Sequence, residues 1–295
     1  MKRILITGAS GLIGSELARL LECYKLICLI RDKKKIDLSI KADYIIGDIR
    51  YDLRQFKGLE IDTIYHLAAL NPLFKDKKMQ REVNVEGMKN IINLARECNV
   101  KNFIYAQGMG IFDNEEITEE SKRNPYTEFA KIRLEAEDIL LNERGNFNIC
   151  IAILGDVYGS KGWFVDMIVK RLKENRFRIP GKGDYYRSFV HVYDASNALK
   201  LLGENESNGY YIICDDHPSK FSEFVYYVAD RLGVNRPGNV PEFIAKLVIG
   251  SDMLRLLTRS VKASNRKIKH ELGFNLKFPN YMSGVDDILS KLSSI

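Results

Sequence analysis

Cysteine, histidine, proline and tryptophan are scarce in this chain of 295 residues, which holds 5 Cys, 4 His, 7 Pro and 1 Trp. The cysteines form no Cys-x-x-Cys pair, and an odd number without regular spacing predicts buried free thiols in a reducing compartment. They are Cys23, Cys28, Cys98, Cys150 and Cys214. The histidines show no spacing typical of metal ligands, so we expect no metal site.

A long uninterrupted apolar run is absent as well. The longest apolar stretch near the C-terminus, residues 243–257, contains Lys246, Asp252 and Arg255, and it is too short and too charged to span a bilayer. Strand-like residues begin at Lys2, which leaves no room for a signal peptide. We therefore expect a cytoplasmic protein without a membrane partner.

A strong charge of one sign is also lacking, since the formal net charge is +6 and the pI is about 8.9. Three consecutive lysines at residues 33–35 form the only dense basic run. No aromatic residues alternate with these lysines, as they would in a protein that binds single-stranded nucleic acid. We therefore expect a solvated loop there and no nucleic-acid partner, while the mild positive excess suits an anionic nucleotide ligand.

The N-terminal residues 1–14 carry the most informative pattern. Residues 1–7 form a short apolar run of strand length, and a helical periodicity begins at Leu12. Between them Gly8 permits a tight turn, Gly11 lets backbone N–H groups approach a pyrophosphate, and Gly14 lets the helix pack closely on the strand. The helix N-terminus then faces the phosphates with its partial positive charge. A plain tight turn is the alternative, but the flanking strand and helix favour a dinucleotide site.

A second strand is predicted at residues 25–30, and it ends in Arg31 and Asp32. In a nucleotide-binding βαβ unit, an acidic residue at this place accepts a hydrogen bond from the ribose 2′-hydroxyl, whereas an arginine pairs with a 2′-phosphate. Arg31 therefore favours NADP over NAD, with Lys33 and Lys34 adding positive charge. A shift of one residue in register would place Asp32 there and favour NAD instead.

Strands and helices alternate through the first half of the chain. Strands are predicted at residues 43–46, 61–67, 102–106 and 149–154, and helices at residues 83–98 and 126–141. This alternation predicts an α/β fold with a doubly wound parallel Rossmann sheet. A dinucleotide-binding domain would comprise residues 1–155, rejoined by about 186–215. A smaller, mostly helical substrate-binding domain would comprise residues 156–185 and 216–295.

Six motifs, in order along nearly the whole chain, resemble the extended short-chain dehydrogenase/reductase family, in particular its nucleotide-sugar epimerases and dehydratases. They begin at Thr7 (TGASGLIG), Gly47 (GD), His66 (HLAA), Asn84 (NVEG), Arg187 (RSFVHV) and Lys267 (KIKHELGF). The resemblance implies an NAD(P)-dependent epimerase, dehydratase or reductase that acts on a nucleotide sugar by hydride transfer. It also implies a possible homodimer that pairs through the helices at residues 83–98 and 126–141, although burial within a monomer accounts equally well for their apolar faces.

The resemblance also assigns roles to residues at the ends of the predicted strands. The cofactor would be bound by Gly8, Ser10, Gly11, Leu12, Ile13, Gly14, Arg31, Asp48, Ile49, Leu67, Ala68, Ala69 and Lys131. Arg187 would hold the diphosphate of the nucleotide sugar, and Asp156 is a second candidate for substrate binding. The pair Arg31 and Asp32 is similar to that of the NADP-using reductases of this family.

The catalytic positions depart from the family's pattern. The family uses a tyrosine four residues before a lysine, because the ammonium favours the phenolate of a phenol whose pKa is otherwise about 10. The lysine corresponds to Lys131, but Thr127 stands four residues before it and Tyr126 is displaced by one. The position of the family's catalytic serine holds Gly108, after Gln107.

Two classes of function follow from this departure. In an active enzyme, which we favour, Lys131 and a shifted acid/base Tyr126 would act together, with Gln107 or Thr127 orienting the substrate. In the alternative, the chain is a catalytically degenerate NAD(P)- and nucleotide-binding protein that acts as a sensor or assembly partner.

Overall fold

The computed structural model describes residues 1–35, 37, 39–70, 72, 74 and 76–293. The chain divides into two compact units, each treated by itself below. Unit 1 comprises Met1–Ile111, Arg123–Ile153 and Ser196–Tyr211, and unit 2 comprises Phe112–Lys122, Leu154–Ala195 and Ile212–Ile295. This division differs from the predicted domains mainly at 112–122 and at 186–195, and by a few residues at 154–155 and 212–215. The reason for the second difference is that the strands at 186–191 pair with strands of unit 2.

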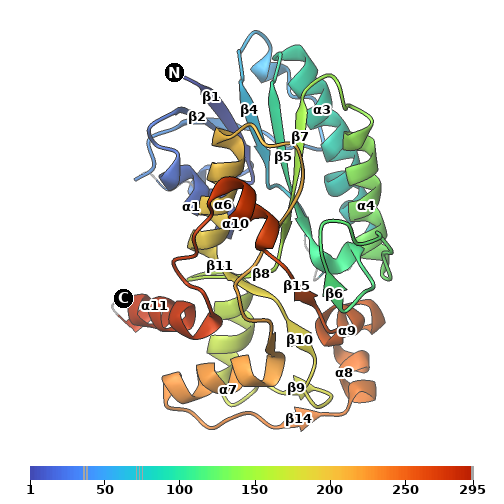
Figure 1. Cartoon of the computed structure of the whole chain (residues 1–295), viewed down its shortest axis with the longest axis vertical. Coiled ribbons are helices and arrows are strands. Elements are labelled where there is room, and N and C mark those ends of the chain that lie inside the picture. The colour runs from blue at the N-terminus through green and yellow to red at the C-terminus, as the bar shows by residue number, and fades with distance from the viewer. Residues whose placement is uncertain (36, 38, 71, 73, 75, 294–295) are drawn as a thin grey trace. The chain divides into compact units, whose positions relative to one another are not determined.

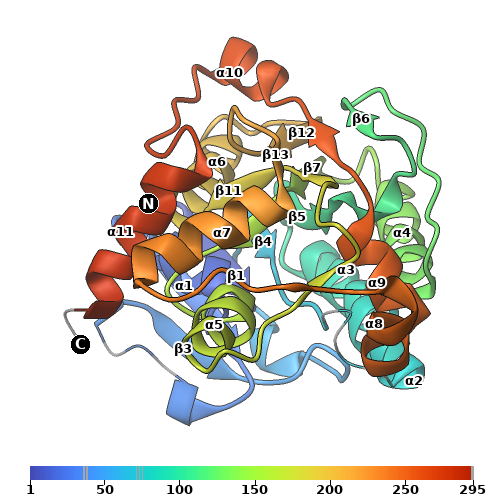
Figure 2. The same cartoon turned by 90° about the horizontal axis from the view of Figure 1, so that it is seen from below.

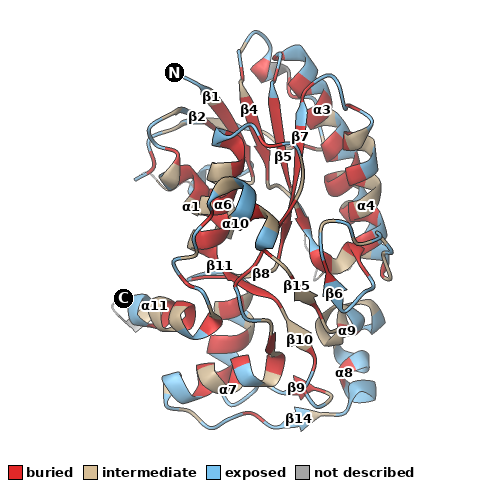
Figure 3. Cartoon of the chain, in the orientation of Figure 1, coloured by how far each residue is buried: buried red, intermediate tan, exposed pale blue. Residues whose placement is uncertain are grey.

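Unit 1 is organised by a seven-stranded sheet with the order β12-β7-β5-β4-β1-β2-β3. The strands are β1 (Arg3–Thr7), β2 (Lys25–Ile30), β3 (Asp43–Ile46), β4 (Thr63–His66), β5 (Asn102–Gly108), β7 (Asn148–Leu154) and β12 (Gly209–Ile213). Strands β1 to β5 pair in parallel, and the strand order reverses between β1 and β4, which confirms the predicted doubly wound sheet. Because helices cover both faces, the central strands are almost entirely apolar and buried (Figure 3).

Helices cover this sheet on two sides (Figure 1). They are α1 (Leu12–Leu20), α2 (Lys77–Arg81), α3 (Gly87–Glu97), α4 (Glu128–Leu141) and α6 (Val192–Glu204). Short turns of other helix types are η1 (Lys33–Lys35), η2 (Arg54–Phe56), η3 (Glu82–Glu86) and η4 (Met109–Ile111). Helices α3 and α4 lie side by side, and Ser196 at α6 donates a hydrogen bond of 3.3 Å to the Ile13 carbonyl of α1.

Unit 2 combines helices with two-stranded pairs. Its helices are η5 (Phe164–Val169), α5 (Lys170–Lys173), α7 (Phe221–Leu232), α8 (Glu242–Ile249), α9 (Ser251–Thr258), α10 (Arg266–Leu272) and α11 (Tyr281–Ser293). Its strands are β6 (Glu116–Ile117), β8 (Asp156–Tyr158), β9 (Ile179–Pro180), β10 (Tyr186–Arg187), β11 (Phe189–His191), β13 (Ser219–Lys220), β14 (Asn239–Val240) and β15 (Lys262–Ala263). The pairs are β10–β13, β11–β8, β14–β9 and β15–β6. Helix α7 lies beside α11 (Figure 2), and Tyr227 donates a hydrogen bond of 3.0 Å to Asp286 between them.

Aromatic packing forms the core of unit 2. Phe189 of β11 stacks on Phe224 of α7 with a centroid distance of 4.2 Å, and Tyr158 meets Phe224 edge-on at 5.9 Å. Such pairs stabilise a core beyond the area they bury.

The cysteines are free, and four of them are buried as expected, but the prediction is wrong for Cys23, which is exposed. Within the described ranges, no helix has both the length and the apolar character needed to cross a membrane. The same ranges contain no group of three or more Cys, His, Asp or Glu side chains arranged to hold a metal ion.

Candidate functional site

The turn between β1 and α1 has the geometry expected from its glycines. Gly8 has a φ of +74°, and a Cβ atom there would lie 2.8 Å from the Ala68 nitrogen and 2.9 Å from the Leu67 carbonyl carbon. A Cβ atom on Gly14 would lie 2.3 Å from the Gly8 oxygen. Gly11 donates its N–H to the Gly8 oxygen at 2.9 Å and is the N-cap of α1, where it provides no side-chain hydrogen bond. The start of α1 is therefore a close, glycine-lined backbone surface.

The end of β4 is fixed to this turn by the Thr7 hydroxyl. The Thr7 oxygen lies 2.8 Å from His66 Nδ1 and accepts a hydrogen bond of 3.2 Å from the Ala68 N–H. Burial lowers the pKa of His66 to about 3, with Arg133 acting in the same direction, so this imidazole is neutral. His66 stacks on Tyr105 and is a packed core residue, while the half-buried Leu67 and Ala68 and the exposed Ala69 continue past the strand.

Charged residues follow the ends of β2 and β3. Arg31 and Asp32 are both exposed, and the Asp32 carboxylate accepts a hydrogen bond of 2.9 Å from the Lys34 N–H. Asp48 forms a forked ion pair with Arg50, at 3.0 Å from Nε and 2.8 Å from Nη2. Burial by itself would raise the pKa of Asp48, but the hydrogen bonds from Arg50 outweigh it and the pKa is lowered. Asp48 is thus a carboxylate held at the sheet edge, with the buried Ile49 next to it.

Gln107, at the end of β5, belongs to a buried polar network. Its Nε2 donates to Glu137 at 2.8 Å and to the Arg133 carbonyl at 3.2 Å, and its Oε1 accepts from the Gly108 N–H at 3.0 Å. Tyr210 donates to the second oxygen of Glu137 at 3.0 Å. Burial raises the pKa of Glu137, although the hydrogen bonds from Gln107 and Tyr210 act in the opposite direction.

The predicted catalytic residues surround the start of α4. Thr127 is the N-cap: its buried side chain accepts a hydrogen bond of 3.2 Å from the Ala130 N–H. Tyr126 is half-buried and lies outside the helix. Asn124 of the same segment donates its N–H to the Ile111 carbonyl at 2.8 Å, which holds the segment against η4, the turn that follows β5. Lys131, whose side chain is 58% exposed, pairs with Glu128 at 2.7 Å.

Gly108 leaves open space at the position of the family's serine. It is exposed, and a Cβ atom built on it would have no neighbour within 4 Å. A hydroxyl-bearing side chain would therefore fit.

The predicted substrate-binding residues of unit 2 contact each other. Arg187 donates from Nε and Nη2 to the two oxygens of Asp156, at 2.6 and 2.7 Å. Its Nη1 donates to the Leu256 carbonyl at the end of α9, at 2.7 Å. The guanidinium is largely covered, with 14% of the Arg187 side chain exposed.

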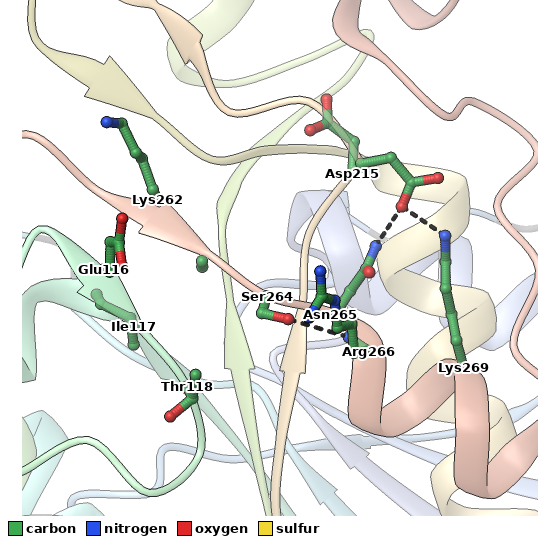
Figure 4. A pocket seen from close by; sticks show the side chains of 11 residues that line it. Glu116, Ile117, Thr118, Asp215, Lys262, Ser264, Asn265, Arg266 and Lys269 are labelled. Carbon is green, nitrogen blue, oxygen red and sulfur yellow. Dashed lines mark hydrogen bonds and ion pairs between the residues drawn. The ribbon is translucent and has the colours of Figure 1, made fainter.

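A separate pocket of about 510 Å³ lies in unit 2 (Figure 4). It is lined by Glu116, Ile117, Thr118, Asp215, Asp216, Lys262, Ala263, Ser264, Asn265, Arg266 and Lys269. None of these described residues was predicted as a site residue. Asn265 and Lys269 both bind the Asp216 carboxylate, so the charges along this wall are internally paired.

Sequence reasoning missed the polar partners of Gln107 and Asp48. Arg133 and Glu137 lie four residues apart on α4 and are buried, so two charged residues on the inner face of an amphipathic helix were the available signal. Arg50 lies two residues after Asp48, and nothing in the local pattern marks it as the partner of that carboxylate.

A doubly wound sheet whose first strand runs through a glycine turn into a helix defines a Rossmann-type α/β protein. Residues 4–214 match the NAD dependent epimerase/dehydratase family, and the chain belongs to this family.

Two curated relatives align over most of the chain. A "3-diazoavenalumate denitrifying reductase" from a Streptomyces species is 23% identical, over 96% of this chain and 99% of the relative. A "4-hydroxy-2-methyl-3-oxo-4-farnesyl-3,4-dihydroquinoline-1-oxide ketoreductase" from Stigmatella aurantiaca is 22% identical, over 92% of this chain and 91% of the relative. The solved structure of MoeE5 in complex with UDP-glucose and NAD shares the fold, with a TM-score of 0.83, 21% identity and 99% of each chain covered.

Proposed function

We propose that this chain is an NAD(P)-dependent oxidoreductase that transfers hydride between a nicotinamide cofactor and a hydroxyl or carbonyl carbon of its substrate. The observation that carries the proposal is the cradle formed by Gly8, Gly11 and Gly14, where any Cβ at Gly8 or Gly14 would collide with backbone. The N-cap of α1 provides no side-chain hydrogen bond, so first-turn N–H groups suit a pyrophosphate.

Around that cradle the other cofactor contacts come from strand ends. Ser10, Leu12 and Ile13 would contact the dinucleotide from the turn, and Leu67, Ala68 and Ala69 would line its path past β4. Asp48 and Ile49 would contact the adenine. Arg31 would pair with a 2′-phosphate, and Asp32 supports that choice because its carboxylate is already bound to the Lys34 N–H. We therefore propose NADP, rather than NAD, as the preferred cofactor.

The catalytic roles fall to the start of α4. When bound, the nicotinamide supplies or accepts the hydride. Tyr126 would hold the proton that moves to or from the substrate oxygen. It precedes the N-cap of α4, so the helical geometry does not fix the direction of its side chain, and the shift of one residue from the family's tyrosine position does not turn it away from the site. Lys131 would bind the nicotinamide ribose and favour the phenolate. The side chains of Thr127 and Gln107 are already hydrogen-bonded, so they would support this site through the N-cap of α4 and the buried network.

Two substrate classes fit the proposal. A nucleotide sugar is supported by the fold shared with a protein that was solved with UDP-glucose and by the sequence motif that begins at Arg187. A carbonyl compound without a nucleotide is supported by the reductase and ketoreductase that align over nearly the whole chain. A cytoplasmic location and a homodimer through α3 and α4 remain predictions. Light scattering of the purified protein tests the homodimer.

Calorimetric titration with NADPH and NADH tests the cofactor site. We expect saturable binding of NADPH by the wild type and none by Gly14→Val, whose side chain would enter the space of the Gly8 carbonyl. Gly238→Val is the control, because a Cβ there meets nothing within 4 Å and the φ of Gly238 is not in the left-handed region. Absence of dinucleotide binding by the wild type would refute the proposal.

The role of Tyr126 is tested separately. For any carbonyl compound that the wild type reduces, Tyr126→Phe should lower kcat by about 100-fold or more and leave the NADPH affinity unchanged. Retained turnover would remove Tyr126 from the mechanism.

A further inference from the structure

The Arg187 guanidinium could bind an anion, but the Asp156 carboxylate of the same chain already occupies it. Its Nε and Nη2 form two parallel hydrogen bonds with the two Asp156 oxygens, at 2.6 and 2.7 Å. A forked pair of this kind is the arrangement by which a guanidinium recognises one carboxylate or one phosphate group. The edge of Arg187 that would receive a phosphate therefore already holds a carboxylate.

The remaining donor edge of Arg187 is engaged as well. Nη1 donates to the Leu256 carbonyl at 2.7 Å and lies 3.4 Å from the carbonyls of Leu257 and Arg259. These oxygens belong to the last turn of α9 and the residue after it, where the helix dipole concentrates negative partial charge. Both edges of the guanidinium thus have partners of the sign that a diphosphate would bring.

The backbone fixes this pair rather than leaving it to a chance rotamer. Asp156 is the first residue of β8 and donates its N–H to the Ser188 carbonyl at 2.8 Å, and Ser188 follows Arg187 directly. The close approach requires Gly155, because a Cβ there would lie 2.4 Å from the Ser188 oxygen. Strand pairing therefore places the carboxylate of Asp156 and the guanidinium of Arg187 side by side.

Neighbouring cations of unit 2 also have carboxylate partners within the chain. Arg259 lies 3.7 Å from Asp113, and Lys262 lies 2.7 Å from Glu115. A diphosphate at Arg187 would thus meet the charge of Asp156, while these two neighbouring cations already have carboxylate partners.

We propose that Asp156 is a specificity-determining residue that occupies the anion-binding edge of Arg187 and disfavours substrates carrying a diphosphate. The inference rests on the proposed oxidoreductase function and refines it: of the two substrate classes, the carbonyl or hydroxy compound without a phosphate is the one that this site accepts. Asp156 then contributes to specificity by repulsion, which discriminates between ligands as effectively as attraction.

Titration with UDP tests this assignment. We expect Asp156→Asn to bind UDP about tenfold or more tightly than the wild type, because the isosteric amide removes the competing charge. Asp156→Glu, which keeps the charge, should not gain affinity. The double variant Asp156→Asn, Arg187→Ala should lose the gain, which locates it at the guanidinium.

Equal UDP affinity in the wild type and Asp156→Asn, including no binding by either, would overturn the assignment, as would weaker binding by Asp156→Asn. NADPH titration and thermal melting of the same variants report separately on the cofactor site and on folding. If NADPH fails to bind any variant or the wild type, the oxidoreductase proposal fails, whereas the UDP comparison still tests the role of Asp156.

Discussion

Gly108 carries a hydrogen where the enzymes that this chain resembles carry a catalytic hydroxyl. The residue is exposed, and the space around its Cβ direction is open, so the loss is chemical rather than steric. Gln107 does not take over the role of this hydroxyl in orienting the substrate, because its amide nitrogen is already bound to Glu137 and to the Arg133 carbonyl. The substrate oxygen would therefore be oriented mainly by Tyr126.

Gly108→Ser should restore an orienting hydroxyl. For a carbonyl compound reduced by the wild type, we expect kcat to rise about tenfold or more, at the lower end of what a positioned proton-bearing group contributes. Gly108→Ala adds the same Cβ without the hydroxyl and should show no such rise. Similar kinetics for the serine and alanine variants would show that a hydroxyl has no role at this position.

Arg31 is the residue on which the choice of cofactor depends. Arg31→Ala should weaken NADPH binding by about 1.5–3 kcal/mol, the scale of a hydrogen bond to a charged group, and leave NADH binding nearly unchanged. Lys35→Ala is the matched control, since it removes a charge from the same exposed segment at greater distance along the chain. Equal losses for both dinucleotides in calorimetric titration would contradict the assignment of a 2′-phosphate site to Arg31.

At the scale of the elements, α4 begins where Thr127 caps it, and this start separates Tyr126 from the helix. Thr127→Ala removes the acceptor for the Ala130 N–H and should lower the free energy of unfolding by about 0.5–2 kcal/mol, measured by urea denaturation. Thr127→Ser keeps the acceptor and should stay close to the wild type. A loss of kcat without a loss of stability in Thr127→Ala would instead support a catalytic hydroxyl.

The elements were largely predictable because local pattern determines them. The strands at Lys25–Ile30 and Asp43–Ile46 have the predicted bounds, because each coincides with a short apolar run, although only the first is buried. The predicted helix at 83–98 begins instead as the π-helical η3, which continues into α3 (Gly87–Glu97). The glycine turn was equally predictable, because its constraint lies within one βα unit.

Contacts between distant elements were not predictable in this way. The Gln107 network joins residues of β5, α4 and β12, and the Arg187–Asp156 pair joins strands that are 31 positions apart in the sequence. The periodicity of a strand or helix shows which of its residues are buried, but not which polar residue of a distant element each of them contacts. The sequence predicts both Arg187 and Asp156 as substrate-binding residues, but only the structure shows that they bind each other.

At the scale of the whole molecule, buried titratable groups make stability depend on pH, and His66, His191 and Asp215 are three whose pKa shifts are large. Burial lowers the pKa of His66 to about 3 and of His191 to about 4, although Asp287 opposes the shift at His191. Burial raises the pKa of Asp215 to about 8, with Asp216 and Asp194 adding to the shift and the His217 N–H opposing it. The histidines stabilise the fold as pH rises toward their unfolded value near 6.5, whereas Asp215 destabilises it between its unfolded value near 3.8 and pH 8.

The opposing trends leave one window in which Asp215 acts without the histidines. Between pH 7 and 8 the unfolded histidines are mostly neutral, while the folded Asp215 keeps a proton that the unfolded chain has released, so the free energy of unfolding should fall by about 1 kcal/mol. Asp215→Asn should flatten this slope in urea denaturation at the two pH values. Asp230→Asn is the control, because the hydrogen bonds from Arg236 lower the pKa of Asp230, so this carboxyl stays ionised throughout the window. If the wild type and Asp215→Asn have the same slope, the buried Asp215 carboxyl is not protonated in the folded chain within this window, and the pH dependence must come from other groups.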